Sequence, residues 1–258
     1  MQKDPRTLEQ EAYEFLGQQK FYDAFVLYQE AAKIYREQNK HKQAALCFAS
    51  AATCWNKKSG ENTFYNGAIA FEQAAAEALK VGDLEYASLL YRYAAINYER
   101  DRELLNYSEC FYRSKECYRK FALLFLTNRQ KIHPIMPSQE SEGVKGAIRY
   151  FFIWCGLTFS YLIWGHGERP VRTFCFGFIL ITLSAFFYTQ GQVVRGEAAF
   201  SPNFMEGLYL SLITFTTVGY GDITPLGYTK IIASVDALFG LVLMPLFLIG
   251  LTRKYLRE

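Results

Sequence analysis

Seven consecutive residues near the C-terminus constrain the fold of this chain more than any other feature. They cover residues 216–222, read Thr-Thr-Val-Gly-Tyr-Gly-Asp, and lie between two long apolar stretches. Glycine adopts positive φ values at little cost, so Gly219 and Gly221 at alternate positions permit a backbone whose successive carbonyl oxygens face one axis. The side chains of Val218 and Tyr220 then point away from that axis. We therefore expect a carbonyl-lined segment rather than an ordinary turn.

The flanking segments predict two long helices and one short helix. An apolar helix is expected over 171–190, and a polar connection follows it. Ser201 and Pro202 then form an N-cap and first-turn pair for a short helix over 202–215. The carbonyl-lined segment comes next, and a second apolar helix is expected over 228–251. This order is the one that a membrane pore requires.

Residues 211–225, SLITFTTVGYGDITP, closely resemble the pore loop of two-transmembrane-helix potassium channels, and the resemblance extends over about residues 165–251. It implies a transmembrane pore domain over 169–258 that conducts K⁺ through a symmetric homotetramer, because one chain supplies a quarter of the carbonyl ring that replaces the hydration shell of the ion. No cofactor is expected besides the permeant ion. The ion-binding filter residues that the resemblance implies are Thr217, Val218, Gly219, Tyr220 and Gly221, of which the first four supply the carbonyl ligands for K⁺.

The resemblance also implies residues that support the filter, among them Thr216 and Asp222 at its two ends. In this family the aspartate after the filter is often held by an aromatic donor eight residues before the filter threonine, and that position is Tyr209 here. A hydrogen bond between Tyr209 and Asp222 is therefore expected. Some members carry a glutamate four residues before the same threonine, where this chain has Ile213. A buried carboxylate at that position is not expected.

The second apolar helix contains candidate gating residues. Gly240, nineteen residues after Gly221, sits where related inner helices have a hinge glycine, and Pro245 removes a backbone hydrogen bond about one turn later. Both are expected to be bending points of a cytoplasmic gate. Asp236 is an acid within the same helix, and such residues are functional by default. It faces either the cavity or the back of the pore helix, and the sequence leaves both alternatives open.

The composition indicates a composite protein rather than a purely soluble or purely membrane one. The chain has 258 residues, 51% apolar content and a mean hydropathy of −0.03. Lys and Arg exceed Asp and Glu by only 28 minus 25, so no nucleic-acid partner is expected. The sequence has no phosphate loop and no convergent Ser, His and Asp set, and we therefore expect no enzymatic activity and assign no catalytic residue.

Residues 1–127 contain a helical repeat. Five nine-residue windows align, and their starts fall 20, 23, 20 and 20 residues apart. Each window places aromatic and small residues on one helical face, which predicts an antiparallel α-solenoid and an all-α fold for the chain. The pattern resembles tetratricopeptide-like repeats, especially the SNAP type, and this resemblance implies a possible peptide or protein partner. The windows are Leu27–Tyr35, Cys47–Trp55, Ala70–Ala78, Leu90–Tyr98 and Cys110–Tyr118.

Four cysteines of this region form two pairs with a spacing of seven residues: Cys47 and Cys54, and Cys110 and Cys117. Their positions on apolar helix faces indicate small core residues, and no histidine or second thiol pair converges locally. Neither a disulfide nor a metal site is expected.

The segment between the repeats and the pore is expected to consist of two parts. Residues 128–147 contain helix-breaking prolines and form a linker. Residues 148–168 follow, and their apolar run is at the lower limit for spanning a bilayer. Trp154, Tyr161 and Trp164 are typical of a membrane interface. We predict an interfacial amphipathic helix here, and a third span is the alternative.

The distribution of basic residues predicts a multi-pass protein of the cell membrane with both termini in the cytoplasm. Two spans return the C-terminus to the side of the N-terminus, and basic residues lie before the first predicted span and after the last. The N-terminus shows no apolar signal-peptide region. The basic residues are Arg149, Arg169, Arg172, Arg253, Lys254 and Arg257.

Three functions are compatible with the sequence. The first is a potassium channel regulated through its cytoplasmic repeats, because no helix carries arginine at every third position as a voltage sensor would. The second is a non-selective or sodium-passing channel, which the intact Thr-Val-Gly-Tyr-Gly motif disfavours. The third is a membrane-tethered interaction scaffold with a vestigial pore.

Overall fold

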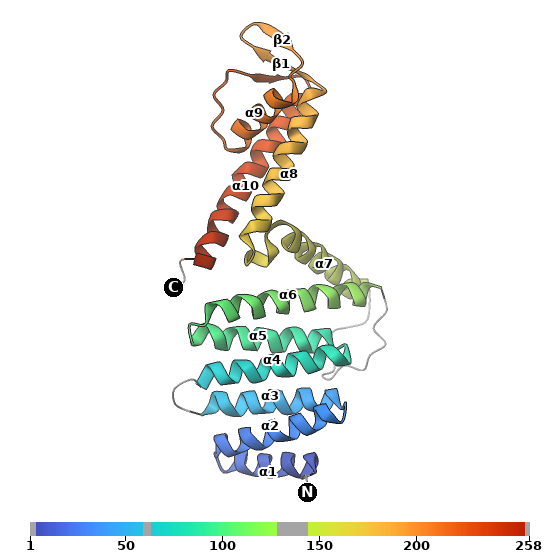
Figure 1. Cartoon of the computed structure of the whole chain (residues 1–258). Helices are drawn as coiled ribbons and strands as arrows, with labels where there is room; N and C mark the ends of the chain where they lie inside the picture. Colours follow the sequence, from blue (N-terminus) through green and yellow to red (C-terminus); the bar gives the residue numbers. More distant parts are fainter. Residues whose placement is uncertain (1–3, 59–62, 128–143, 256–258) are drawn as a thin grey trace. The chain divides into compact units, whose positions relative to one another are not determined.

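The computed structural model describes residues 4–58, 63–127 and 144–255, most of which are helical (Figure 1). The chain divides into two compact units, Met1–Thr158 and Phe159–Glu258. The predicted all-α class is confirmed, although three short strands occur that were not predicted.

Six helices form a stack in the first unit, and each packs against the next one along the chain (Figure 1). Consecutive helices run in opposite directions because the connections between them are short. The assignment to the tetratricopeptide-like class stays a prediction. The helices are α1 (Pro5–Gly17), α2 (Phe21–Glu37), α3 (His41–Lys57), α4 (Thr63–Val81), α5 (Leu84–Arg100) and α6 (Leu104–Leu126).

The same turn recurs at four of the connections in this stack. Shortly after each of these helices, one residue adopts a positive φ. The amide of the residue that follows it donates to the carbonyl five positions earlier in the chain, as the amide of Lys20 does to the carbonyl of Phe15 at 2.9 Å. This is the bonding pattern of a Schellman cap, which satisfies the last carbonyls of the helix. The residues with positive φ are Gln19, Asn39, Gly82 and Arg102.

Pairs of alanines pack the helices together at equivalent positions of the first four repeat windows. Their small side chains are completely or almost completely buried and let neighbouring helices approach closely. The fifth window has Ser114 there, and its buried hydroxyl donates to the carbonyl of Ser88 at 2.8 Å. The predicted core role of Cys47, Cys54, Cys110 and Cys117 is confirmed by their burial. The alanine pairs are Ala31 and Ala32, Ala51 and Ala52, Ala74 and Ala75, and Ala94 and Ala95.

A long apolar helix, α7 (Val144–Trp164), precedes the 3-10 turn η1 (Gly165–Gly167). In the first unit Tyr150 of α7 is buried against Phe121 and Phe125 of α6, with ring centroids 5.6 and 4.2 Å apart. The predicted linker over 128–147 requires one correction, because its last four residues form the first turn of α7; the remainder lies outside the described residues.

Among the residues that the structure describes, three helical segments are long and apolar enough to cross a membrane: Val144–Gly167, Pro170–Thr189 and Thr229–Lys254. The first contains α7, so this helix qualifies as a span by length and composition. Neither property fixes the depth of a helix in a bilayer, and the interfacial placement of 148–168 stays a prediction.

The second unit is built on three helices and a small antiparallel sheet. The sheet has the order β2-β1-β3, and Val193 of the central strand is opposite both Phe200 and Pro225. The elements after α7 and η1 are α8 (Pro170–Thr189), β1 (Gln192–Arg195), β2 (Ala198–Phe200), α9 (Phe204–Phe215), β3 (Thr224–Leu226) and α10 (Thr229–Tyr255).

The predicted start of the short helix was wrong. Asn203, rather than Ser201, is the N-cap, and α9 begins at Phe204 instead of residue 202. Asn203 accepts a hydrogen bond from the amide of Glu206 at 3.0 Å, while the Glu206 carboxylate accepts one from the amide of Asn203. This reciprocal capping box fixes the start of α9 more firmly than a serine followed by proline.

Candidate functional site

The predicted filter segment begins directly after α9. The amide of Gly219 donates to the carbonyl of Ile213 at 3.0 Å, which folds the segment back against the last turn of the helix. Gly219 and Gly221 adopt positive φ values of 49° and 77°, as predicted from their identity. Thr217 also has a positive φ, 59°, so the left-handed conformation occurs at three alternate residues. The identity of Thr217 gave no signal for this.

The C-terminal end of the segment is held to α9 by a side-chain hydrogen bond. The Tyr209 hydroxyl donates to Oδ2 of Asp222 at 2.9 Å, which confirms the predicted bond. This bond to a carboxylate raises the pKa of Tyr209 above its ordinary value. Asp222 is thereby fixed to the short helix that precedes the segment.

The small sheet connects α8, α9 and α10 near this end. Arg195 in β1 forms an ion pair with Glu206 of α9 at 3.0 Å. The hydroxyl of Thr229, at the start of α10, accepts from the amide of Leu226 at 2.8 Å and lies 3.0 Å from the carbonyl of Gln192. Strands of three or four residues give little periodic signal, which explains why the sequence did not predict them.

Asp236 lies behind the short helix, which decides between the two alternatives left open by the sequence. Its side chain is buried, and its Oδ2 accepts a hydrogen bond from the Ser211 hydroxyl of α9 at 2.7 Å. The contact joins α10 to α9 through polar groups in an apolar setting. Such a buried pair resists separation, because either group left alone would lose its partner without regaining water.

Gly240 is a packing contact between α10 and α9. A Cβ at this position would overlap the backbone carbonyl oxygen of Phe215, the last residue of α9. Only glycine therefore permits this approach without a shift of one helix. Pro245 lies inside the same helix α10. The hinge roles of Gly240 and Pro245 stay predictions, and the packing role of Gly240 was missed because it depends on the contact between two helices.

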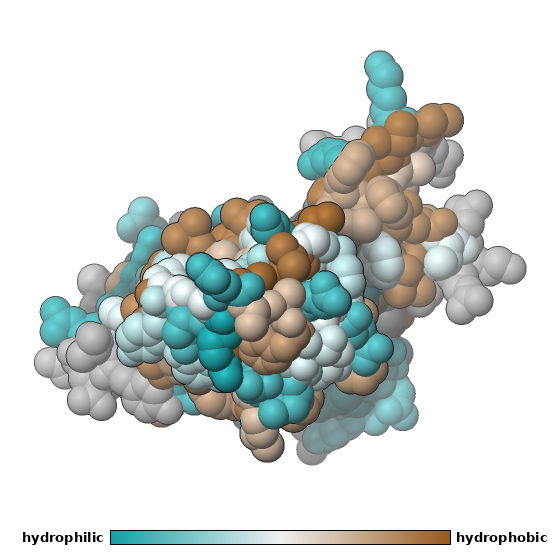
Figure 2. Space-filling model, turned by 90° about the horizontal axis from the view of Figure 1, so that it is seen from above, coloured by the Kyte–Doolittle hydropathy of each residue, from teal (hydrophilic) through white to brown (hydrophobic). Residues whose placement is uncertain are grey.

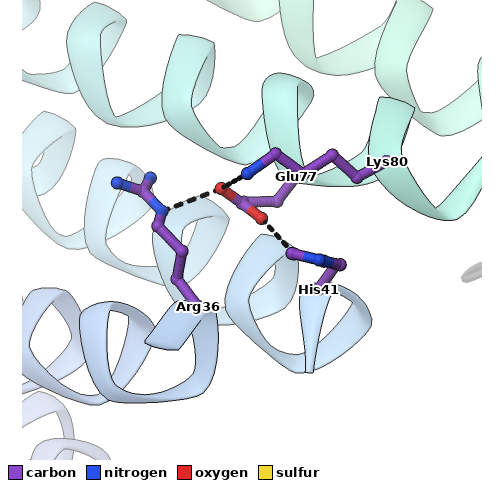
Figure 3. Close-up of polar contacts among 4 residues, drawn as sticks. All are labelled: Arg36, His41, Glu77 and Lys80. Carbon is purple, nitrogen blue, oxygen red and sulfur yellow. Dashed lines mark hydrogen bonds and ion pairs between the residues drawn. The ribbon is translucent and has the colours of Figure 1, made fainter. Parts of the chain in front are cut away.

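A second polar cluster lies in the first unit and was also missed. Glu77 of α4 is only 1% exposed, and its carboxylate is surrounded by three basic side chains (Figure 3). Arg36 Nε and Lys80 Nζ lie 2.8 and 3.1 Å from Oε1, and His41 Nδ1 lies 2.7 Å from Oε2. The cluster ties α2, α3 and α4 together. The signal in the sequence that could have indicated this cluster is the position of Glu77, an acid within the alanine-rich repeat window Ala70–Ala78.

The electrostatics of this cluster favour the charged form of Glu77. Burial alone raises the pKa of the carboxyl, but the hydrogen bonds from His41 and Lys80 and the charges of Arg36 and Lys80 outweigh it. The pKa of Glu77 is consequently below its ordinary value. The arrangement contains no group placed to react, and we interpret it as a structural ion-pair cluster. Within residues 4–58, 63–127 and 144–255, no three His, Cys, Asp or Glu side chains are placed to hold a metal ion.

Comparisons with known proteins concern the C-terminal part of the chain. Residues 173–257 match a family model described as an ion channel. The protein LctB of Bacillus caldotenax is 38% identical over an alignment of 61 residues, and the match covers 19% of this chain and 46% of LctB. The chain thus spans less than half of that relative. No solved structure matches the chain. The family match and the apolar helices of this region indicate that residues 173–257 form a pore module similar to that of an ion channel.

Proposed function

We propose that this chain is a potassium-selective channel that conducts passively through a homotetrameric pore and is regulated through its N-terminal unit. The observation that carries the proposal is the segment 216–222, which follows α9 and has left-handed backbone at Thr217, Gly219 and Gly221. Alternate left-handed residues let consecutive carbonyl groups face the same side. The helices α8 and α10 pack against α9 and support the segment from behind.

The chemistry of dehydration favours potassium as the permeant ion. A narrow pore must replace the water shell of the ion by oxygen ligands, and carbonyl rings do this for K⁺. In this proposal the carbonyls of Thr217, Val218, Gly219 and Tyr220 supply one quarter of each ring. Four chains related by a closed rotation complete the coordination.

Exposed apolar side chains support assembly of several chains. Hydrophobic residues reach the molecular surface (Figure 2), and in the filter segment Val218 and Tyr220 are 52% and 72% exposed. Side chains that support a filter pack against other protein atoms. Val218 and Tyr220 are too exposed within one chain to be packed in this way, so a neighbouring chain is expected to cover them. Further exposed apolar residues lie on α9. These residues are Phe204, Met205 and Leu212.

Regulation through the N-terminal unit is proposed from two features of the chain: the arginine pattern of its helices and the size of its six-helix stack. Within the described residues no helix carries arginine at every third position, so the stimulus is not expected to act on a charged voltage-sensing helix. The six-helix stack is the largest other part of the chain. A change in this unit is therefore expected to shift the equilibrium between closed and open pores.

The reversal potential of the current tests the proposal. Purified full-length protein in planar bilayers, under asymmetric K⁺ and Na⁺, should give a barium-sensitive current that reverses near the potassium equilibrium potential. Gly219→Ala should abolish this current. Gly196→Ala is the matched control, because Gly196 also has a positive φ but lies at the tip of the β1–β2 hairpin with open space around it.

Two other results would replace the proposal. A current that does not distinguish K⁺ from Na⁺ would indicate a non-selective cation pore. An assembled tetramer that carries no current, and whose cellular function survives Gly219→Ala, would indicate a membrane-tethered scaffold.

A further inference from the structure

A groove with a volume of about 790 Å³ opens on the first unit between α3 and α5. These two helices lie on either side of α4, which contributes Phe71 to the groove. From Leu46 to Lys57 the groove follows α3 over twelve residues, or about 16 Å for the eleven steps of about 1.5 Å between them. A peptide of about five residues has this length when extended.

Large apolar side chains line one part of this groove and remain accessible. Leu46 of α3 is 38% exposed, and Tyr93 of α5 is 44% exposed. The ring of Tyr93 lies 5.5 Å from that of Phe71, which holds it in place. Most tyrosines of the repeat windows are buried between helices, whereas Tyr93 presents its ring to the groove. Covering such a surface with an apolar side chain removes apolar area from water and so lowers the free energy.

The other end of the groove is basic. Lys57 and Arg100 line it at the C-terminal ends of α3 and α5, and both are exposed. Neither forms an ion pair with a carboxylate within the described part of the chain, and no carboxylate is among the described residues that line the groove. Arg100 instead lies 5.0 Å from the ring of Phe64, which orients its guanidinium. An acidic group entering here would meet two positive charges and no negative one.

We infer that this groove binds an extended segment of a partner protein in which apolar side chains are followed by an acidic residue. The apolar side chains cover Leu46 and Tyr93, and the carboxylate pairs with Lys57 and Arg100. Ser50 and Thr53 lie between these two parts on α3. The Thr53 hydroxyl donates to the carbonyl of Ala49 at 2.9 Å and retains its acceptor capacity for the peptide backbone, and the Ser50 hydroxyl supplies a second polar contact. A fatty acid would match the charge but would leave these hydroxyl groups facing an alkyl chain, so a peptide fits the groove better.

A positional-scanning array of seven-residue peptides tests this inference on the full-length protein in lipid nanodiscs. The wild-type protein should select peptides with apolar residues followed by Asp or Glu. Lys57→Glu combined with Arg100→Glu should weaken the selected peptides at least tenfold and shift the selection toward Lys or Arg. Lys33→Glu combined with Lys42→Glu makes the same change in charge on exposed residues outside the groove and should leave the selection unaltered.

A second variant tests the apolar part. Leu46→Ser combined with Tyr93→Ser should weaken the same peptides while circular dichroism confirms that the helices remain folded. The inference is overturned if no peptide is retained above empty nanodiscs, if charge reversal leaves the selection unchanged, or if oleate binds the groove in preference to every peptide. Because binding is measured without ion flow, its failure is distinguishable from a failure of potassium conduction.

Discussion

Two residues, Tyr209 and Asp222, connect the C-terminal end of the predicted filter segment to the helix that precedes it. In this bond the Tyr209 hydroxyl donates to Oδ2 of Asp222 at 2.9 Å, so the residue that directly follows Gly221 is fixed to α9. The amide of Gly219 also donates to the carbonyl of Ile213 in the last turn of α9. The left-handed residues Thr217, Gly219 and Gly221 are therefore held to α9 by two separate contacts.

Removing the hydroxyl of Tyr209 should destabilise the conducting form of the pore. In Tyr209→Phe, Asp222 loses its donor from α9, and we expect the current to decline several times faster during sustained opening at unchanged K⁺ selectivity. The measurement is the decay of macroscopic current. Tyr13→Phe, which alters an exposed ring on α1, is the control. Equal decay in both variants would argue against a role for the bond in conduction.

Glu77 should make the stability of the first unit dependent on pH. Its pKa is lower in the folded chain than the ordinary value, so its contribution is complete at neutral pH. The contribution is lost as the pH falls below the ordinary value, about 4.3, through the lower folded value. Glu77→Gln should cost about 1–3 kcal/mol at pH 7, because three basic groups lose their charged partner.

Thermal unfolding of the full-length protein from pH 7 to pH 3 measures this effect. The difference between wild type and Glu77→Gln should shrink as the pH falls below about 4. Glu14→Gln alters an exposed acid of α1 and should show no such difference. A difference that does not shrink below about pH 4 would contradict the lowered pKa.

At the level of elements, the helices were predictable from their apolar periodicity, whereas the contacts between them were not. The apolar helices over 171–190 and 228–251 correspond to α8 and α10 within a few residues. The three strands were too short to give a pattern, and Asn203 competed with Ser201 as an N-cap. The contact of Gly240 with Phe215 depends on how α10 crosses α9, and no local pattern contains that information.

This contact changes what a substitution of Gly240 is expected to do. A hinge glycine replaced by alanine should alter open probability and leave selectivity unchanged. The overlap of the new Cβ with the carbonyl of Phe215 should instead displace the end of α9, from which the filter segment begins. Overpacking of this kind costs about 1–3 kcal/mol. We therefore expect Gly240→Ala to lower both thermal stability and K⁺ over Na⁺ selectivity.

Gly156→Ala is the control, since nothing lies within 4 Å of a Cβ at Gly156. Reversal potentials and thermal unfolding of both variants distinguish the two roles of Gly240. Unchanged selectivity with altered open probability would favour the hinge over the packing contact.

For the whole molecule, the effect of the first unit on the pore can be tested without removing it from the assembled protein. A protease site introduced within residues 128–143 would permit cleavage while current is recorded. If the first unit regulates the pore, cleavage should change open probability and leave the reversal potential unchanged. The same protease added to protein without the site is the control. If cleavage leaves the open probability unchanged, the role of the first unit is assembly or targeting rather than regulation of the pore.

The placement of α7 determines the topology of the whole chain. With α7 in the interface and two spans, both termini lie on the same side of the membrane, and protease-sensitive tags at the two ends should be cleaved from that side. If α7 spans, as its length and composition allow, the two tags should be cleaved from opposite sides. Sealed vesicles of known orientation provide the measurement.

Each helix of the six-helix stack finds its principal partners in the helices before and after it in the chain. The helix α1 packs mainly on α2, and its Glu9 also lies close to Cys47 of α3, so its loss removes fewer contacts than the loss of a helix from the middle of the stack. Stability in such a stack is close to a sum over neighbouring pairs. During evolution the stack can thus be lengthened or shortened at its N-terminal end one helix at a time, and amide exchange should be fastest in α1 and slower toward the middle of the stack.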